Sequence, residues 1–386
     1  MRRLRASGRD EGRVMIRPSS PLTMLLSRHT RRRERMMNPK CQTRPGFDTL
    51  SARSADLTGL KMRRITRREF ISLLGAAAAW PLAARAQQAG RRYRLGILHN
   101  QGPQSPMFPP FYDELRRLGF VEGQNLIVEA RGYALRTEQF PAIASELAHA
   151  EVDAILAGGT AAARAAQAAT RTIPILTLND DMVGQGLVAS LARPGGNVTG
   201  ISILATELDG KRQEILMEMV PAARRMAVLA DAHTVSSSNM RSLQKAARAR
   251  GVELVIRTVE RPERIVPEIE EARRAGAEAL NVLASPILHA RRLDIFERTA
   301  ALRLPAMYQS PEFAEEGGLI GYGPRITLMF RQLARQLAKV FSGEKASDVP
   351  VEQPTTFELA INLQAAKGIG FEVPPSLVLR ADKVIE

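Results

Sequence analysis

The chain has 386 residues, with 55 basic and 40 acidic side chains and a single cysteine. The basic excess belongs to the first 90 residues, which hold 20 of the basic and 6 of the acidic side chains, so residues 91–386 are nearly neutral. A neutral body lacks the positive footprint of a nucleic-acid-binding protein, and we expect no nucleic-acid partner. Because Cys41 lies in the basic leader, the rest has no disulfide, thiol nucleophile or thiolate metal site.

Residues 62–86, MRRITRREFISLLGAAAAWPLAARA, have the pattern of an export signal. A basic segment with Arg67 and Arg68 precedes an apolar run, and a small-x-small cleavage pattern ends at Ala86. The paired arginines resemble the twin-arginine motif, with an ordinary basic signal as the alternative. We expect cleavage near Ala86 and a periplasmic location. We expect no membrane anchor, because Pro81 interrupts an apolar run shorter than the roughly 20 residues that cross a bilayer.

Residues 1–61 are rich in arginine and lack apolar periodicity. They also place the export signal far from the first residue, which is unusual for an exported protein. Two interpretations remain open: a non-native extension upstream of a true start at Met62, or a disordered basic tail.

From Arg91 onward, short apolar runs rich in Ile, Val and Leu alternate with longer helical patterns. This alternation predicts parallel sheets covered by helices. In a first lobe, residues 91–200, we expect strands at 94–99, 126–130, 154–157 and 173–178 and helices at 109–118, 138–148 and 160–170.

A turn-forming cluster at 193–197 is followed by a second series of the same kind, which predicts a second lobe at residues 201–325. Its expected strands are 226–230, 253–258, 279–283, 306–308 and 319–321, and its expected helices are 208–219, 238–250, 262–275 and 286–302. Residues 326–386, with a helix at 326–341, a strand at 357–361 and a final short helix, are expected to cross back between the lobes. The predicted fold class is α/β, with two doubly wound parallel-sheet lobes and a ligand cleft between them.

Ligands of open parallel sheets bind at the carboxyl ends of the strands, where helix N-termini present free amides. Asn100 lies in the first such loop, and Gly158-Gly159-Thr160 opens a helix in a later one. Glycines permit close backbone approach, so this loop is suited to an anionic ligand group, although it also fits a plain capped turn. Asn179 and Asp181 follow the next strand. Asp181 is suited to a ligand ammonium or, alternatively, to bracing the turn.

In the second lobe, three residues near strand ends are candidates for orienting or packing a ligand. Ser237 belongs to a serine cluster, and Ser285 precedes Pro286 in the pattern of a helix cap. Tyr308 ends a strand and is the candidate for an aromatic wall.

The sequence gives little support for a catalytic site or a metal site. The histidines show neither HxH nor HExxH spacing, no GxSxG elbow occurs, and the serine cluster lacks an evident base. We therefore expect no enzyme activity, no cofactor and no metal.

The stretch GQGLVASLARPGGNVTG at 184–200 resembles the signature of ABC transporter substrate-binding proteins related to the tryptophan/tyrosine-binding group. Further matching segments, in order along the chain, are 118–126, 172–175, 317–323, and 361–363 with 366–367. The family pattern has Asp-Pro-Val where this chain has Asp181-Met182-Val183. The resemblance covers essentially all of residues 91–386.

The resemblance implies a type I periplasmic binding protein, a monomer that closes over a small solute and delivers it to a membrane permease of an ABC importer. The solute it implies is an amino acid or a similar small polar or aromatic compound. Three alternatives stay open: a ligand-sensing periplasmic receptor, a periplasmic enzyme on the same fold, and an intracellular repressor. The export signal and the absence of a helix-turn-helix pattern argue against the repressor.

Overall fold

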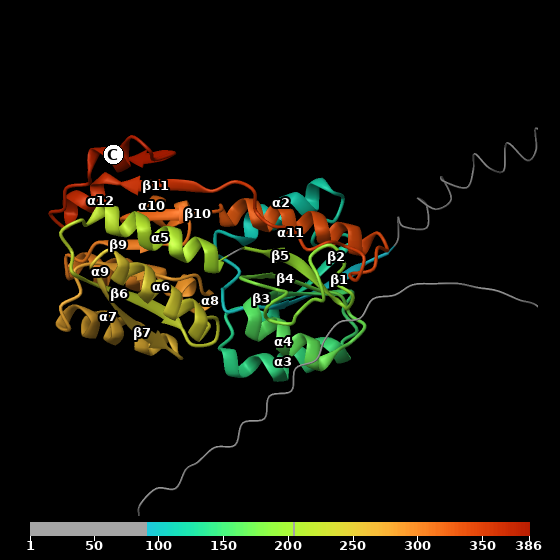
Figure 1. Ribbon diagram of the computed structural model, residues 1–386. Coiled ribbons are helices and arrows are strands. Elements are labelled where there is room, and N and C mark those ends of the chain that lie inside the picture. The colour runs from blue at the N-terminus through green and yellow to red at the C-terminus, as the bar shows by residue number, and fades with distance from the viewer. Residues whose placement is uncertain (1–90, 204) are drawn as a thin grey trace, which may run out of the picture. The chain divides into compact units, whose positions relative to one another are not determined.

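The computed structural model describes residues 91–203 and 205–386, which fall in a single compact unit. The predicted extension 1–61 and the predicted export signal 62–86 lie outside the described residues. Two mostly parallel sheets, each covered by helices, make up the described part (Figure 1), which confirms the predicted fold class. Across residues 91–203 and 205–386, no helix has both the length and the apolar character that a bilayer crossing requires.

The first lobe is built on a five-stranded, fully parallel sheet. Its order is β2-β1-β3-β4-β5, with β1 at Tyr93–Leu98, β2 at Leu126–Glu129, β3 at Ala154–Gly158, β4 at Ile175–Asn179 and β5 at Val198–Ser202. One face is covered by α2 (Phe108–Arg117) and α11 (Ile326–Phe341), and the other by α3 (Phe140–His149) and α4 (Gly159–Ala169).

The second lobe is built on a seven-stranded sheet of order β12-β11-β10-β9-β8-β6-β7, parallel except between β10 and β11. The strands are β6 (Arg225–Asp231), β7 (Glu253–Val259), β8 (Leu280–Val282), β9 (Ala306–Tyr308), β10 (Ile320–Gly323), β11 (Glu358–Asn362) and β12 (Lys383–Ile385). One face packs on α5 (Ala205–Met219), α6 (Ser237–Ala249), α12 (Leu363–Gly368) and α13 (Pro375–Val378). The other packs on α7 (Ile265–Arg274), α8 (Pro286–Ala290), α9 (Arg292–Ala301) and α10 (Pro311–Glu315).

Both sheets repeat one topology. The order β7-β6-β8-β9-β10 in the second sheet matches β2-β1-β3-β4-β5 in the first, so each lobe has its first strand next to its second and third. In this doubly wound order, the crevice at the carboxyl ends of the first and third strands is where ligands bind. The loops after β1 and β3, and those after β6 and β8, are therefore the candidate ligand-binding loops.

The C-terminal segment closes the outer edge of β5. After the second sheet, the chain returns to the first lobe as α11, which lies beside α2 in Figure 1 and buries Phe330 and Leu333 against it. Glu352 then pairs with β5: its amide donates to the carbonyl of Gly200 over 3.0 Å, and its carbonyl accepts from the Ser202 amide over 2.9 Å. The chain afterwards enters the second sheet at β11.

Three elements differ from the prediction. β5 was not predicted, because VTGIS is short and contains Gly200, and its pairing depends on β4 and on the distant Glu352. The expected helix 286–302 is two helices, since Arg291 leaves the helical region at φ −105° and ψ 19°. β12, at the chain end, was also missed.

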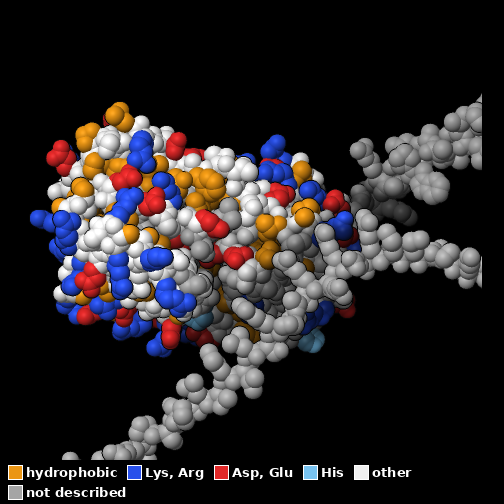
Figure 2. All heavy atoms as spheres, viewed as in Figure 1, with side chains coloured by type: hydrophobic (Ala, Val, Ile, Leu, Met, Phe, Trp, Pro, Cys, Tyr) orange, Lys and Arg blue, Asp and Glu red, His pale blue; other side chains and the backbone are white. Residues whose placement is uncertain are grey.

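Figure 2 shows Lys and Arg side chains interspersed with Asp and Glu over the visible face. This distribution fits the nearly neutral charge of residues 91–386.

Gly200→Ala tests the packing of β5. Gly200 has φ +142°, and a Cβ there would lie 1.9 Å from the carbonyl oxygen of Thr177, a backbone atom that cannot rotate away. We expect a loss of at least about 2 kcal/mol in the free energy of unfolding, measured by urea denaturation. The control is Gly210→Ala in α5, where a Cβ meets nothing within 4 Å. This change should be neutral or add about 0.5–1 kcal/mol. Equal stabilities of the two variants would contradict the packing.

Candidate functional site

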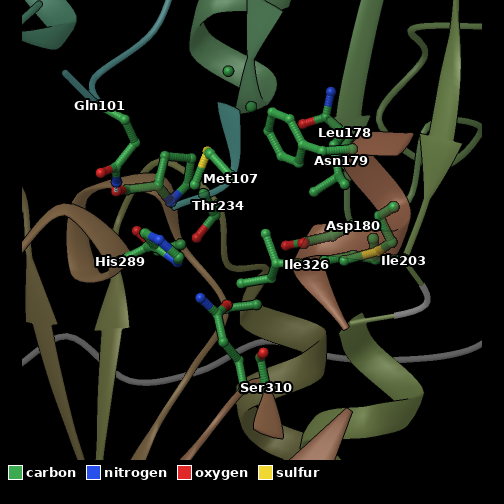
Figure 3. Close-up of a pocket in the computed structure, with 18 of the residues that line it drawn as sticks. Gln101, Met107, Leu178, Asn179, Asp180, Ile203, Thr234, His289, Ser310 and Ile326 are labelled. Atoms are coloured by element: carbon green, nitrogen blue, oxygen red, sulfur yellow. Dashed lines mark hydrogen bonds between the residues drawn. The ribbon is translucent and has the colours of Figure 1, made fainter. Parts of the chain in front are cut away.

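A cavity lies where the carboxyl ends of the two sheets face one another. Its volume is about 90 Å³, which is room for several water molecules and therefore suits a small solute. Its lining comes from both lobes and from α11 and includes His99, Asp180, Ser285, His289 and Phe330. In Figure 3, Asp180 and Ile203 lie on one side of the pocket and Gln101 and His289 on the other, with Met107 between.

The N-terminus of α4 opens onto this cavity. Its cap residue, Gly158, has no side chain. Among the residues that the structure describes, none caps the helix with its side chain, so the first amides of α4 are available to a ligand. Gly159 has φ +85°, which glycine adopts readily. A Cβ on Gly159 would lie 2.6 Å from Cγ of Pro286, so the lobes meet closely here. Free amides and the helix dipole together favour an anionic group.

Thr160 and Asn179 line the cavity but use their side chains within the protein. The Thr160 hydroxyl lies 2.9 Å from Oδ1 of Asn179 and 2.8 Å from Oε1 of Gln185. Nδ2 of Asn179 donates to the Thr177 hydroxyl, which donates to the carbonyl of Ala157 on β3. This chain of hydrogen bonds joins the ends of β3 and β4 and fixes the shape of the wall.

Asp180 follows β4 and projects into the same cavity (Figure 3). Its carboxylate has no hydrogen-bond partner among the described residues. Loss of hydration between the lobes, reinforced by the charge of Asp209, raises the pKa of Asp180 to about 8, although Arg212 acts in the opposite direction. An empty site therefore favours a protonated Asp180, and a cation placed beside it would favour the ionised form.

Arg212 and Asp209, both on α5, form a buried ion pair beside the cavity. Nη1 of Arg212 donates to Oδ1 of Asp209 over 2.9 Å, while Nε and Nη2 donate to the carbonyls of Tyr322 and Gln309. Burial raises the pKa of Asp209 to about 6. Because all three guanidinium nitrogens of Arg212 are hydrogen-bonded within the protein, we infer that Arg212 joins α5 to the ends of β9 and β10.

Ser285, Asp231 and His233 lie together but in an order that does not activate a nucleophile. The Ser285 hydroxyl donates to Oδ2 of Asp231 over 2.7 Å and accepts from the amides of Ile287 and Leu288 at the start of α8. His233 contacts the other carboxylate oxygen through Nδ1 at 3.0 Å. The carboxylate stands between serine and histidine, so the imidazole does not contact the hydroxyl whose proton it would have to remove. The predicted cap at Ser285 is present.

Two buried histidines face the cavity, His99 after β1 and His289 on α8. Burial lowers the pKa of His99 to about 4, and burial together with the charge of Arg292 lowers that of His289 to about 3. Both rings are therefore neutral at pH 7. Within the described residues, no three side chains of the metal-ligating types gather into a cluster.

The structure places the predicted site residues in different surroundings. Five line the cavity: Gly158, Gly159, Thr160, Asn179 and Ser285. The Asn100 side chain instead donates to the carbonyl of Leu135. Asp181 lines an adjoining polar compartment of about 500 Å³, where its carboxylate accepts the amide of Gly184.

Ser237 and Tyr308 also lie apart from the cavity lining. Ser237 is an exposed residue in the first turn of α6. Tyr308 is 1% exposed, its ring packs edge-on against Phe296 of α9, and its hydroxyl lies 3.1 Å from that of Thr299. Because side chains alternate across a strand, Tyr308 points into the helix-covered core. The aromatic wall of the cavity is Phe330 of α11, which the sequence analysis did not single out.

The fold and cavity define a two-lobed binding protein of the type I periplasmic class. The model of the family described as "ABC transporter substrate binding protein" matches residues 109–385, and the chain belongs to that family. The family consists of non-enzymatic binding proteins, as the sequence predicted. Proteins of this kind are the substrate-binding components of ABC transporters, which implies a small solute and the transporter as partners.

Individual relatives are distant. A curated protein from Clostridioides difficile strain R20291, named "Tyrosine-binding protein", is 26% identical over 267 residues, which cover 68% of this chain and 76% of the relative. A Vibrio cholerae structure described as a conserved domain protein has a TM-score of 0.68 at 22% identity, covering 76% of this chain and 99% of the other. An ABC domain in complex with L-Trp from Streptococcus pneumonia has a TM-score of 0.65 at 20% identity, covering 76% and 100%. These likenesses in structure show the shared fold.

The neutral histidines predict a loss of stability in acid. When the pKa of a histidine in the folded protein lies below its ordinary value of 6.5, the histidine does not reduce the free energy of unfolding at pH values above 6.5. As the pH falls from 6.5 toward 4, each should remove up to about 1.4 kcal/mol per pH unit, because only the unfolded chain accepts the proton. Urea unfolding between pH 7.5 and 4.5 measures this. The variant His99→Asn/His289→Phe should have a shallower pH slope than the unaltered protein, and identical slopes would show that these rings are not the cause.

Proposed function

We propose that this protein captures an amino acid or a related zwitterion outside the cytoplasm and delivers it to the permease of an ABC importer. The observation that carries the proposal is the shared cavity, in which the free amides of α4 and the unpartnered carboxylate of Asp180 come from neighbouring strands. Tyrosine and L-Trp in the names of two relatives support an amino-acid solute. The export-signal pattern at residues 62–86 supports an extracytoplasmic, periplasmic location.

Neighbouring strand ends suit the two charged groups of a zwitterion. Gly158 pairs with Leu178 in the register of β3 and β4, so the start of α4 and Asp180 lie at adjacent positions on one edge of the sheet. Adjacent strands are about 4.8 Å apart, a separation that lets one small molecule reach both. The ligand carboxylate would accept from the amides at Gly159 and Thr160, and the ammonium would donate to Asp180. Each charge-assisted hydrogen bond contributes roughly 1.5–3 kcal/mol.

Closure would follow from contacts that need both lobes. Gln101 of the first lobe donates through Nε2 to the carbonyl of Pro286 in the second over 3.3 Å, and Pro286 also covers Gly159. A ligand between the lobes favours this arrangement only by the additional contacts it makes there. Passage from an open to a closed form is a hinge motion, with the segments that join the two sheets as hinges.

Asp180→Asn is the first test. Asparagine keeps the size of the side chain but cannot form an ion pair with an ammonium. We expect binding of the preferred amino acid to weaken at least tenfold in isothermal titration calorimetry, a change of about 1.4 kcal/mol. The matched control is Asp181→Asn, which alters the adjoining compartment and the turn at Gly184, and should change affinity by less than threefold. The reverse pattern would assign the ammonium to Asp181, and unchanged affinity in both would remove the assignment.

The pH dependence of binding is a second test. Because the pKa of Asp180 lies near 8 in the ligand-free site, an ammonium ligand must displace a proton below that pH. The affinity should therefore rise by up to about tenfold per pH unit from pH 6.5 and level off near pH 8. Titrations at pH 6.5, 7.5 and 8.5 would measure it. The rise should be absent in Asp180→Asn, and a rise of equal size in that variant would mean that another group titrates.

A further inference from the structure

The outer side of α11 is basic, and the helix contains no acidic residue. Its sequence is ITLMFRQLARQLAKVF, and its inner side lines the cavity with Phe330 and Leu333. The opposite side carries Arg331, Arg335 and Lys339 at intervals of four residues, so these three side chains follow one line along the helix. Lys339 is exposed and has no ion-pair partner among the described residues. The near-neutral charge of the two lobes as a whole therefore conceals a local excess of positive charge.

A buried carboxylate of α2 holds the neighbouring guanidinium groups in place. Glu114, whose side chain is 7% exposed, accepts from Nη1 of Arg117 over 2.8 Å and from Nη1 of Arg335 over 3.1 Å. Nη1 of Arg331 lies 4.0 Å from the same carboxylate. Three guanidinium groups thus share one negative charge. Because a guanidinium has five N–H donors in a rigid fork, each of the three retains donors for oxygen atoms of a partner.

Two exposed leucines border this cluster. Leu328 is 51% exposed and lies three residues before Arg331 on α11, and Leu118 is 44% exposed and lies four residues after Glu114 at the end of α2. Residues three or four apart share one side of a helix, so both leucines lie on the side that carries the charges. Figure 2 shows hydrophobic and basic side chains close together over α2 and α11. We call the following set the basic face: Arg117, Arg331, Arg335, Lys339, Leu118 and Leu328.

This combination of side chains favours an anionic lipid surface as the partner. Lipid phosphates accept from guanidinium and ammonium groups, and leucines beside them enter the boundary between headgroups and acyl chains. A free phosphate ion would satisfy the charges and leave both leucines in water. The two helices carry five basic and two acidic side chains, an excess of three positive charges. Since each basic residue near an anionic membrane adds roughly fivefold to binding, this excess predicts a preference on the order of a hundredfold over a neutral membrane.

We propose that the basic face binds reversibly to the surface of a membrane rich in anionic phospholipids, without insertion of the chain. This goes beyond the proposed function and does not depend on which solute is bound. Because the residues of α11 that line the cavity lie on the other side of the helix, contact with lipid leaves the cavity free. The permease of an ABC importer lies in a membrane, so this contact would concentrate the protein near its partner.

A fluorophore attached at one position tests the proposal in the full chain. Cys41→Ser removes the single cysteine, and Leu328→Cys then carries an environment-sensitive fluorophore on the basic face. The matched control is Leu293→Cys, at an exposed leucine of α9 in the second lobe. With vesicles of equal parts phosphatidylglycerol and phosphatidylcholine, we expect the emission to shift to the blue at residue 328 and not at residue 293. Phosphatidylcholine alone, at the same lipid concentration, should shift neither.

Removal of charge is the second measurement. Arg331→Gln/Lys339→Gln spares the two arginines that donate to Glu114, and should raise the lipid concentration at half-maximal shift at least tenfold. The matched control is Arg241→Gln/Lys245→Gln, which removes the same charge from the exposed side of α6, a basic helix without an exposed large hydrophobic residue. It should change that concentration less than twofold. Salt at about 0.5 M should weaken the shift, because it screens the charges.

Three outcomes overturn the proposal. The first is no shift at residue 328 with anionic vesicles. The second is a shift at both labelled positions, or equal weakening by the two charge variants, because the chain would then adsorb through its overall charge. The third is a shift that requires native membrane vesicles and disappears after these vesicles are treated with protease, which would make an acidic protein the partner.

The proposed function is measured separately from this contact. Calorimetric titration of the charge variants with an amino acid should give the affinity of the unaltered protein, because the altered side chains lie outside the cavity. Loss of lipid binding with intact solute binding therefore concerns the basic face alone. Melting temperatures of the variants confirm that each is folded.

Discussion

The site depends on one constraint, which is that the parallel strands of each doubly wound sheet, β1 to β5 in the first lobe and β6 to β10 in the second, end on the same edge. Each carboxyl-end loop, and the N-terminus of each helix that follows, then faces one side of its lobe. Here two such edges face one cavity, so Gly159 of the first lobe meets Pro286 of the second. Side chains that are far apart in the sequence converge because both lobes have this topology, which places the loops after their parallel strands around one cavity.

The same burial that creates the cavity suppresses charge within it. Asp180 has a raised pKa, the histidines have lowered ones, and the charge of Arg212 is neutralised by Asp209. An empty cavity therefore contains few uncompensated charges, which keeps the cost of a closed, dry interior small. It nevertheless retains hydrogen-bonding capacity in the amides of α4 and the carboxyl group of Asp180. A ligand that supplies the matching groups restores what burial removed, and this is a basis for discrimination that apolar contact alone does not provide.

Sequence periodicity was enough to predict the two sheets apart from β5 and β12, most of the helices, and the loops that line the cavity. It placed Gly158, Gly159, Thr160 and Asn179 correctly at the strand ends that line the cavity. It could not decide which of two adjacent aspartates faces inward, because that depends on the exact residue at which β4 ends. The direction of the Tyr308 side chain also depends on its exact position in β9, because successive side chains of a strand point to opposite faces of the sheet. The role of Phe330 in the cavity wall could not be predicted for another reason. α11 reaches the wall only because the chain returns to the first lobe, and this return has no local sequence signal.

The polar contacts across the cavity bear on the proposed closure of the lobes. Among the described residues, the loops facing one another across the cavity share one direct hydrogen bond, from Gln101 to Pro286 at 3.3 Å, near the weak end of the range. Shifting a two-state equilibrium from 1:99 to 99:1 requires about 5.5 kcal/mol of differential binding. Two charge-assisted contacts of roughly 1.5–3 kcal/mol each sum to about 3–6 kcal/mol, a range that includes that magnitude. Recognition of the ligand and closure of the lobes would then have the same energetic source.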